Sequence, residues 1–241
     1  MEVDALSLFK DGLQNDDIEV KVSTMKKLDL VMKAIGEDRV HDELVPYLHS
    51  EYIDNNKTDD EILFVLAEQI GNAWTHVSDK LTFLPILKEL AKVDETIVRD
   101  QAAKTMESIE ASLSPKHVQN TFVPLVMELI NEEWFTGRLT ASLLIPTAYP
   151  KATPKQKDKL KKFFHRLCHD EMPMVRKAAA GKIGNFAKNV EKELLEDEII
   201  PNYLELVQDK HDNIKLAAVE KLHEFVKVAP QSKTLIKITV S

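Results

Sequence analysis

Three side chains near residue 167 have the types and the spacing of metal ligands. His165, Cys168 and His169 stand at relative positions 0, 3 and 4, and residues with this spacing share one face of a helix. Imidazole nitrogen and thiolate sulfur are preferred ligands of Zn²⁺, but a structural site needs four of them. The sequence offers no fourth ligand, so we predict a core cysteine, peripheral histidines, and a protein without a metal or other cofactor.

Motifs for phosphate binding or nucleophilic catalysis are missing from the sequence. It contains no G-x-x-x-x-G-K-[ST], G-x-G-x-x-G or G-x-S-x-G segment, the patterns that place phosphates or a reactive serine at the start of a helix. One family of helical-repeat hydroxylases uses several His-Glu pairs for a di-iron site, and only His223-Glu224 fits that pattern here. We therefore predict a non-catalytic protein and keep a helical-repeat metalloenzyme as the least favoured alternative.

The composition is that of a helix-rich intracellular protein. Of 241 residues 44% are hydrophobic and only six are glycine, which disfavours strand-rich folds. A single cysteine allows no internal disulfide, and the N-terminus lacks a signal peptide, so we expect a cytosolic or nuclear setting. No apolar stretch is long enough to span a membrane. The net charge of −8 disfavours nucleic acid as a partner.

Two independent features recur with a period of about 39 residues. A short acidic turn followed by an apolar and a basic residue occurs at VDETIVRDQA, EEWFTGRLTA, DEMPMVRKAA and KHDNIKLAAV, with intervals of 39, 38 and 39 residues. A proline inside an apolar run occurs at Pro46, Pro85, Pro124 and Pro201, with steps of 39, 39 and 77. A shared period indicates tandem structural repeats.

Each unit is predicted to be a helical hairpin: helix A with the proline, an acidic turn, and helix B. Helix B of the fifth unit places its apolar residues at offsets 0, 3, 4, 8, 11 and 12 from Val175, which is one helical face; the sixth unit repeats this from Ile214 to Val226. The proline should bend every helix A, and Pro146 should shorten or kink helix B of the fourth unit. These patterns are typical of HEAT repeats, and they predict an all-α solenoid of about six units with an atypical C-terminal tail. The units are 1–38, 39–77, 78–115, 116–153, 154–192 and 193–230, and the tail is 231–241.

The turns between the paired helices carry the candidate binding residues. Their carboxylates suit helix capping and also form an acidic edge that would steer a basic partner. From the residues alone, Trp134 and Phe135 pack under the next hairpin, Pro173 starts a helix and Met174 is a core residue. Arg99, Arg138, Arg176 and Lys215 recur directly after the apolar turn residue, which predicts cations bonded to neighbouring acidic turns.

Several segments resemble the scaffold subunit of protein phosphatase 2A, the 65 kDa type, in order and in register from near residue 5 to about 230. They are VLAEQIG at 65–71, VDETIVRDQA at 93–102, FVPLV at 122–126, EWFTGR at 133–138, MPMVRKAAAGKIGNFAK at 172–188 and EIIP at 198–201. The match is to the N-terminal repeats of that family.

The resemblance implies a protein-binding scaffold. In the family the N-terminal repeats hold a regulatory (B-type) subunit on their turns, and the last repeats hold the catalytic subunit, so we expect that platform to lie outside this chain. The resemblance reverses the buried interpretation of the WFT turn and places the partner surface on nine turn residues. These are Asp94, Glu95, Trp134, Phe135, Arg138, Asp170, Pro173, Met174 and Lys177. The alternative from the same fold is an unrelated HEAT-repeat adaptor, for example in nuclear transport.

Overall fold

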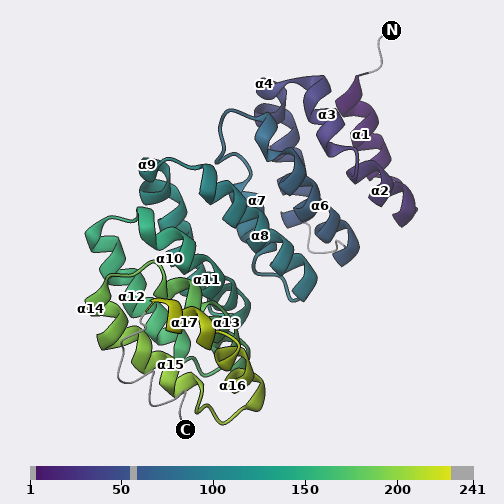
Figure 1. Ribbon diagram of the computed structural model, residues 1–241. Coiled ribbons are helices and arrows are strands. Elements are labelled where there is room, and N and C mark those ends of the chain that lie inside the picture. The colour runs from purple at the N-terminus through teal and green to yellow at the C-terminus, as the bar shows by residue number, and fades with distance from the viewer. Residues whose placement is uncertain (1–3, 55–58, 229–241) are drawn as a thin grey trace. The chain divides into compact units, whose positions relative to one another are not determined.

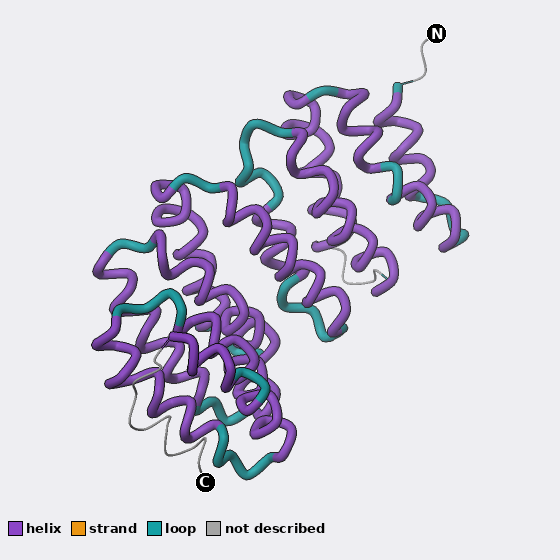
Figure 2. The backbone as a smooth tube through the Cα atoms, in the orientation of Figure 1, coloured by secondary structure: helices purple, strands orange, loops and turns teal. Residues whose placement is uncertain are grey.

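The computed structural model describes residues 4–54 and 59–228 of the chain. These residues form helices joined by short turns, and none of them lies in a β-strand (Figures 1 and 2). The chain divides into two compact units, Met1–Leu113 and Ser114–Ser241. The all-α prediction is confirmed. Within the described part, no helix is both long and apolar enough to cross a membrane.

Unit 1 consists of antiparallel helical hairpins that pack side by side (Figure 1). α6 packs against α2 and α3 on one side and against α8 on the other. Its helices are α1 (Ala5–Leu13), α2 (Ile18–Met25), α3 (Leu28–Ile35), α4 (Glu37–Arg39), α5 (Val45–His49), α6 (Asp60–Ala73), α7 (Leu84–Leu90) and α8 (Thr96–Ser112). Shorter turns complete the unit: π-helical Val40–Leu44 and Ser50–Asp54, and 3₁₀-helical Trp74–His76.

Unit 2 repeats the hairpin plan, with α11, α13 and α16 stacked in succession. Its helices are α9 (Pro115–His117), α10 (Val123–Ile130), α11 (Phe135–Ala148), α12 (Pro154–Cys168), α13 (Pro173–Ala187), α14 (Lys192–Leu194), α15 (Ile200–Leu206), α16 (Asp212–Val219) and α17 (Leu222–Val228). Its shorter turns are π-helical Val118–Phe122 and Leu195–Ile199, and 3₁₀-helical Tyr149–Lys151. The predicted tail 231–241 lies outside the described residues.

Capping side chains explain where many of these helices begin. The carboxylates of Asp17 and Asp59 accept hydrogen bonds from the amides of Glu19 and Glu61 at 2.8 and 2.9 Å, at the starts of α2 and α6. Thr153 and Gln156 form a reciprocal capping box at the start of α12. Each cap satisfies an amide that has no partner inside its helix.

The core of unit 2 is built on the predicted face of α13. Val175, Ala179, Ile183, Phe186 and Ala187 are buried, as the helical spacing indicates. The Phe186 ring contacts those of Tyr149 and Phe164, with centroids 5.1 and 4.5 Å apart. Aromatic contacts of this kind join three neighbouring helical segments into one core.

The repeated prolines interrupt the A helices rather than bend them within a continuous α-helix. Pro46, Pro124 and Pro201 stand in the first turn of α5, α10 and α15, each directly after a π-helical turn. Proline donates no hydrogen bond, and its ring clashes with the carbonyl four residues earlier. A wider π-helical turn is a recognised way for a helix to absorb such a disruption. Pro85 also stands in the first turn of its helix, but α7 follows a hydrogen-bonded turn at residues 80–83 and not a π-helical one.

The B helices differ from the expectation in two places. Pro146, predicted to shorten or kink helix B of the fourth unit, stands inside α11, which ends two residues later at Ala148. The side-chain amide of Asn189 donates to the Pro146 carbonyl at 3.0 Å and helps satisfy the helix end. In the sixth repeat the expected single helix B is divided into α16 and α17, and Val226, expected on its buried face, is exposed.

Candidate protein-binding site

The turn between α10 and α11 exposes a large aromatic side chain. Trp134 has extended backbone angles as the N-cap of α11, and 74% of its surface is exposed. Phe135, the next residue, is half-buried. The interpretation that both pack under the next hairpin is therefore wrong for Trp134. A β-carbon at Gly137 would lie 2.8 Å from the Glu132 side chain, so the glycine allows α11 to start this close to the preceding turn.

An ion pair joins this turn to the following one. Arg138 Nε and Nη2 donate to the two carboxylate oxygens of Asp170 at 2.8 and 3.1 Å, and the side chains are only 13% and 7% exposed. Arg138 Nη1 also donates to the Glu133 carbonyl at 2.9 Å. Despite burial, the hydrogen bonds to Asp170 raise the pKa of the Arg138 guanidinium above its ordinary value. The pair fixes the positions of the two turns relative to each other.

The same arrangement recurs one repeat later. Arg176 donates to the carboxylate of Asp209 at 2.7 and 3.2 Å and to the Asp170 carbonyl at 2.7 Å. The Arg176 hydrogen bonds hold the pKa of Asp209 below its usual range, although burial opposes this. The predicted bonding of turn cations to neighbouring acidic turns is confirmed for Arg138 and Arg176. Lys215 instead pairs with Asp212 of its own turn at 2.9 Å.

Exposed side chains flank these ion pairs at the start of α13. Met174 is 44% exposed and Lys177 is exposed, while Pro173 is half-buried in the first turn of the helix. The expectation of a core methionine is wrong, and that of a helix-starting proline is confirmed. We call residues 131–135 and 169–177 the turn ridge of unit 2. They form the α10–α11 turn, the turn before α13 and the start of α13. The turn ridge presents apolar, cationic and anionic groups on a fixed backbone.

The remaining two predicted binding residues lie in unit 1. Asp94 is exposed, and Glu95 is the half-buried N-cap of α8, accepting from the Ile97 amide at 3.5 Å. Arg99 donates to the carbonyls of Val93 and Asp94 at 2.8 and 2.6 Å, so it stabilises its own turn. Ile97, at the start of α8, is 55% exposed and is not among the predicted binding residues. The polar residues that flank the Ile97-Val98 pair are the sequence feature that indicates its exposure.

The potential metal ligands belong to helix packing. Cys168 is buried, and burial raises the pKa of its thiol. His165 Nδ1 lies 2.7 Å from Asn202 Oδ1, and His169 Nε2 contacts the Glu205 carboxylate, so both imidazoles contact α15. Among the described residues no three His, Cys, Asp or Glu side chains are grouped to hold a metal ion.

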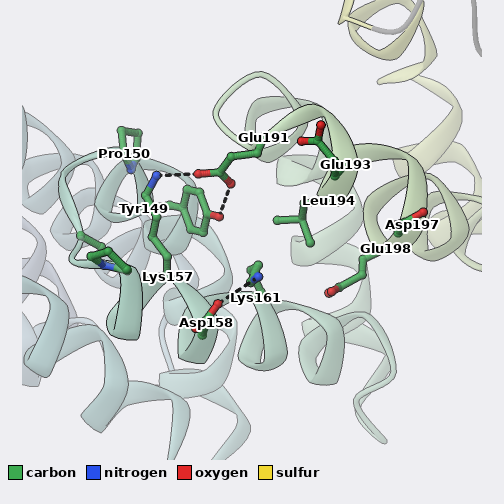
Figure 3. A pocket seen from close by; sticks show the side chains of 12 residues that line it. Tyr149, Pro150, Lys157, Asp158, Lys161, Glu191, Glu193, Leu194, Asp197 and Glu198 are labelled. Carbon is green, nitrogen blue, oxygen red and sulfur yellow. Dashed lines mark hydrogen bonds and ion pairs between the residues drawn. The ribbon is translucent and has the colours of Figure 1, made fainter.

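A groove of about 570 Å³ runs along α12, opposite α14 and its following turn (Figure 3). Glu191 accepts from Lys157 Nζ at 2.8 Å and from the Tyr149 hydroxyl at 2.7 Å, and these bonds lower its pKa to about 2. Lys161 pairs with Asp158 at 3.1 Å. These charged groups bind one another, so the groove contacts serve packing between repeats.

Comparisons with known proteins identify relatives of the chain. The HEAT repeat family matches residues 160–190. The chain is 38% identical over 194 residues to the "Protein phosphatase 2A scaffold subunit" of Dictyostelium discoideum, covering 79% of this chain and 33% of that protein. It is also 38% identical over 193 residues to the "Serine/threonine-protein phosphatase PP2A 65 kDa regulatory subunit" of Drosophila melanogaster, covering 79% and 32%.

A third relative extends the match along this chain. It is the "Probable serine/threonine-protein phosphatase PP2A regulatory subunit" of Caenorhabditis elegans, 35% identical over 224 residues, covering 91% of this chain and 37% of that protein. The chain thus spans about a third of the length of the curated relatives it matches. Among solved structures, Cex1p is similar in fold, with a TM-score of 0.58, 14% identity, and coverage of 95% of this chain and 44% of that one.

Proposed function

We propose that this chain, a homologue of the protein phosphatase 2A scaffold subunit over about a third of its relatives' length, is a non-catalytic scaffold that binds a regulatory (B-type) subunit. The turn ridge of unit 2 is the proposed contact surface in that unit, and the turn with Asp94 and Glu95 contributes in unit 1. One observation carries the proposal: Trp134 is 74% exposed directly before a helix that a buried ion pair holds in place.

An exposed tryptophan on a rigid turn is suited to be a binding anchor. Large aromatic side chains dominate the energetics of protein interfaces when a partner covers them. Arg138 and Asp170 hold the turns before binding, so little backbone entropy is lost when a partner docks. Met174 adds a flexible apolar contact and Lys177 adds a cation next to it.

The proposal assigns no reaction and no cofactor to the chain. The names of its relatives describe scaffold and regulatory subunits of a phosphatase, and the ion pairs of the ridge have a structural role. We propose a cytoplasmic or nuclear location, where such a complex would assemble.

Affinity purification with quantitative mass spectrometry tests this function. A tagged chain, incubated with cell extract, should recover B-type regulatory subunits, and the purified chain should bind one of them directly. Recovery of nuclear transport factors in their place would support the HEAT-repeat adaptor and contradict the proposal.

A further inference from the structure

The charge of α12 is opposite to that of the chain as a whole. The helix contains five lysines and one arginine against a single aspartate, a net charge of +5. The whole chain carries −8, so all other residues together carry −13. α12 is therefore a strongly basic helix in an acidic protein.

Only part of this charge is used inside the fold. Lys157 and Lys161 face the groove along α12 and pair with Glu191 and Asp158 (Figure 3). Lys155, Lys159 and Lys162 are exposed, and none of these three forms an ion pair with a carboxylate in residues 4–54 or 59–228. They remain available to an external anion.

The three free lysines lie in one line. With Arg166 they stand at relative positions 0, 4, 7 and 11, which an α-helix places on a single stripe. The opposite face of α12 holds the buried residues Leu160, Phe164, Leu167 and Cys168. We call Lys155, Lys159, Lys162 and Arg166 the basic stripe.

One end of the basic stripe also offers an aromatic surface. The Arg166 guanidinium lies over the half-buried Phe163 ring, 5.2 Å from its centroid, and Nη2 donates to the Ile130 carbonyl at 2.9 Å. These contacts hold Arg166 in place beside the three lysines.

Helix stability alone does not require the stripe. Like charges three or four residues apart destabilise a helix, and Lys155 stands in the first turn, where the helix dipole disfavours a cation. Uncharged helix-forming side chains would stabilise α12 better than these lysines do. The arrangement therefore favours an interaction with an external anionic group.

We propose that the basic stripe docks a short acidic peptide segment of a protein partner. Side chains of aspartate or glutamate spaced along an extended segment complement four cations, the first and last of which lie 11 residues apart along the helix, roughly 16 Å. The other residues of the chain carry a net charge of −13. This charge repels an extended polyanion such as an anionic membrane or a long nucleic acid. A short segment contacts α12 alone.

Binding of labelled peptides to the full chain tests the proposal. The probe is a fluorescein-labelled ten-residue peptide with six glutamates, and its control has glutamine at those six positions. The glutamate peptide should bind in 50 mM salt and the glutamine peptide should not. The Lys155→Gln, Lys159→Gln, Lys162→Gln triple variant should lose about tenfold in affinity, since each exposed ion pair contributes modestly. Replacing the same three lysines by arginine should retain binding.

A matched variant separates the stripe from net charge. Lys21→Gln, Lys26→Gln, Lys27→Gln removes the same charge from unit 1 and should leave peptide affinity unchanged. Equal losses in the two glutamine variants would overturn the proposal, as would preferential binding to phosphatidylserine vesicles or to oligo(dT). The melting temperature of the α12 variant should not fall, because the substitution relieves repulsion between like charges.

Discussion

The missing side chain of Gly184 on α13 makes room for the buried carboxylate of Glu224 on α17. A β-carbon at Gly184 would lie 2.8 Å from Glu224 Oε2 and 3.0 Å from its Cβ. An ion pair with Lys188 holds the carboxylate in this position, since Lys188 Nζ lies 2.8 Å from Glu224 Oε2. A glycine in mid-helix thus allows the last two described hairpins to approach closely.

Gly184→Ala should therefore destabilise the protein although alanine is the better helix former. Displacing the Glu224 Cβ requires a shift of α17, and overpacking of this kind costs typically about 1–3 kcal/mol, more than the ~1 kcal/mol gained in helix propensity. Urea unfolding followed by circular dichroism measures the difference.

Gly181→Ala on the same helix is the matched control. Nothing lies within 4 Å of a β-carbon at Gly181, so this substitution should raise the free energy of unfolding by about 0.5–1 kcal/mol. If both variants were stabilised, the close approach at Gly184 would not be a constraint.

The helical repeat was predictable because it depends on local periodicity. Apolar residues at helical spacing and a recurring proline identify the hairpins, and a cation at one fixed position of the turns identifies Arg138 and Arg176, which bond to the next acidic turn. The relatives confirm the resemblance to the phosphatase scaffold. Such local patterns predict the helices and the turns that join them, but not how far each side chain is exposed.

Features set by tertiary geometry were not predictable. A π-helical turn differs from an α-helical turn by one residue, so hydrophobic spacing alone cannot locate the turns before Pro46 and Pro124. Hydrophobicity alone favours burial of Trp134 and Met174. Their exposure depends on the direction of each turn, which Gly137 and the Arg138–Asp170 pair determine in the folded chain.

The Arg138–Asp170 pair should contribute strongly to stability. Asp170→Ala leaves a guanidinium that is only 13% exposed without its carboxylate and removes the acceptor of the Met172 amide, bonded at 2.9 Å. Breaking a largely buried pair from one side costs about 3 kcal/mol. Chemical unfolding of the purified variant measures this loss.

Glu171→Ala provides the comparison for that pair. Its carboxylate is 86% exposed and lies 3.7 Å from Arg138 Nη2, so its loss should cost under about 0.5 kcal/mol. Equal destabilisation by the two substitutions would mean that the buried Arg138–Asp170 pair contributes no more to stability than the exposed Glu171 carboxylate.

The contact between His169 and Glu205 should make stability depend on pH. Burial alone would lower the pKa of His169, but the His165 carbonyl and the Glu205 carboxylate outweigh it, and the pKa is raised. The pKa of His169 is higher in the folded chain than in the unfolded chain, where it is about 6.5, so the contact stabilises the fold fully when the pH is below that value. The stabilisation is lost as the pH rises through the folded-state pKa. The side chain is 38% exposed, so solvent screening keeps the effect below about 1 kcal/mol.

Unfolding at pH 6 and pH 8.5 measures this dependence. The wild-type chain should lose more stability than His169→Gln between these two values, because glutamine has no proton to release. An identical loss in both proteins would assign the pH dependence to other groups.

Trp134→Ala and Lys177→Glu test the turn ridge by separating binding from folding. Trp134 is 74% exposed and Lys177 is exposed, so neither substitution should change the melting temperature by more than a degree or two. Truncation of an aromatic anchor typically costs about 2 kcal/mol, which weakens binding of a purified B-type subunit roughly thirtyfold. Leu30→Ala, at a residue that is 64% exposed in α3, controls for loss of apolar surface and should leave the affinity unchanged. Unchanged affinity of the folded Trp134→Ala variant, measured by calorimetry, would mean that the turn ridge does not contact the B-type subunit.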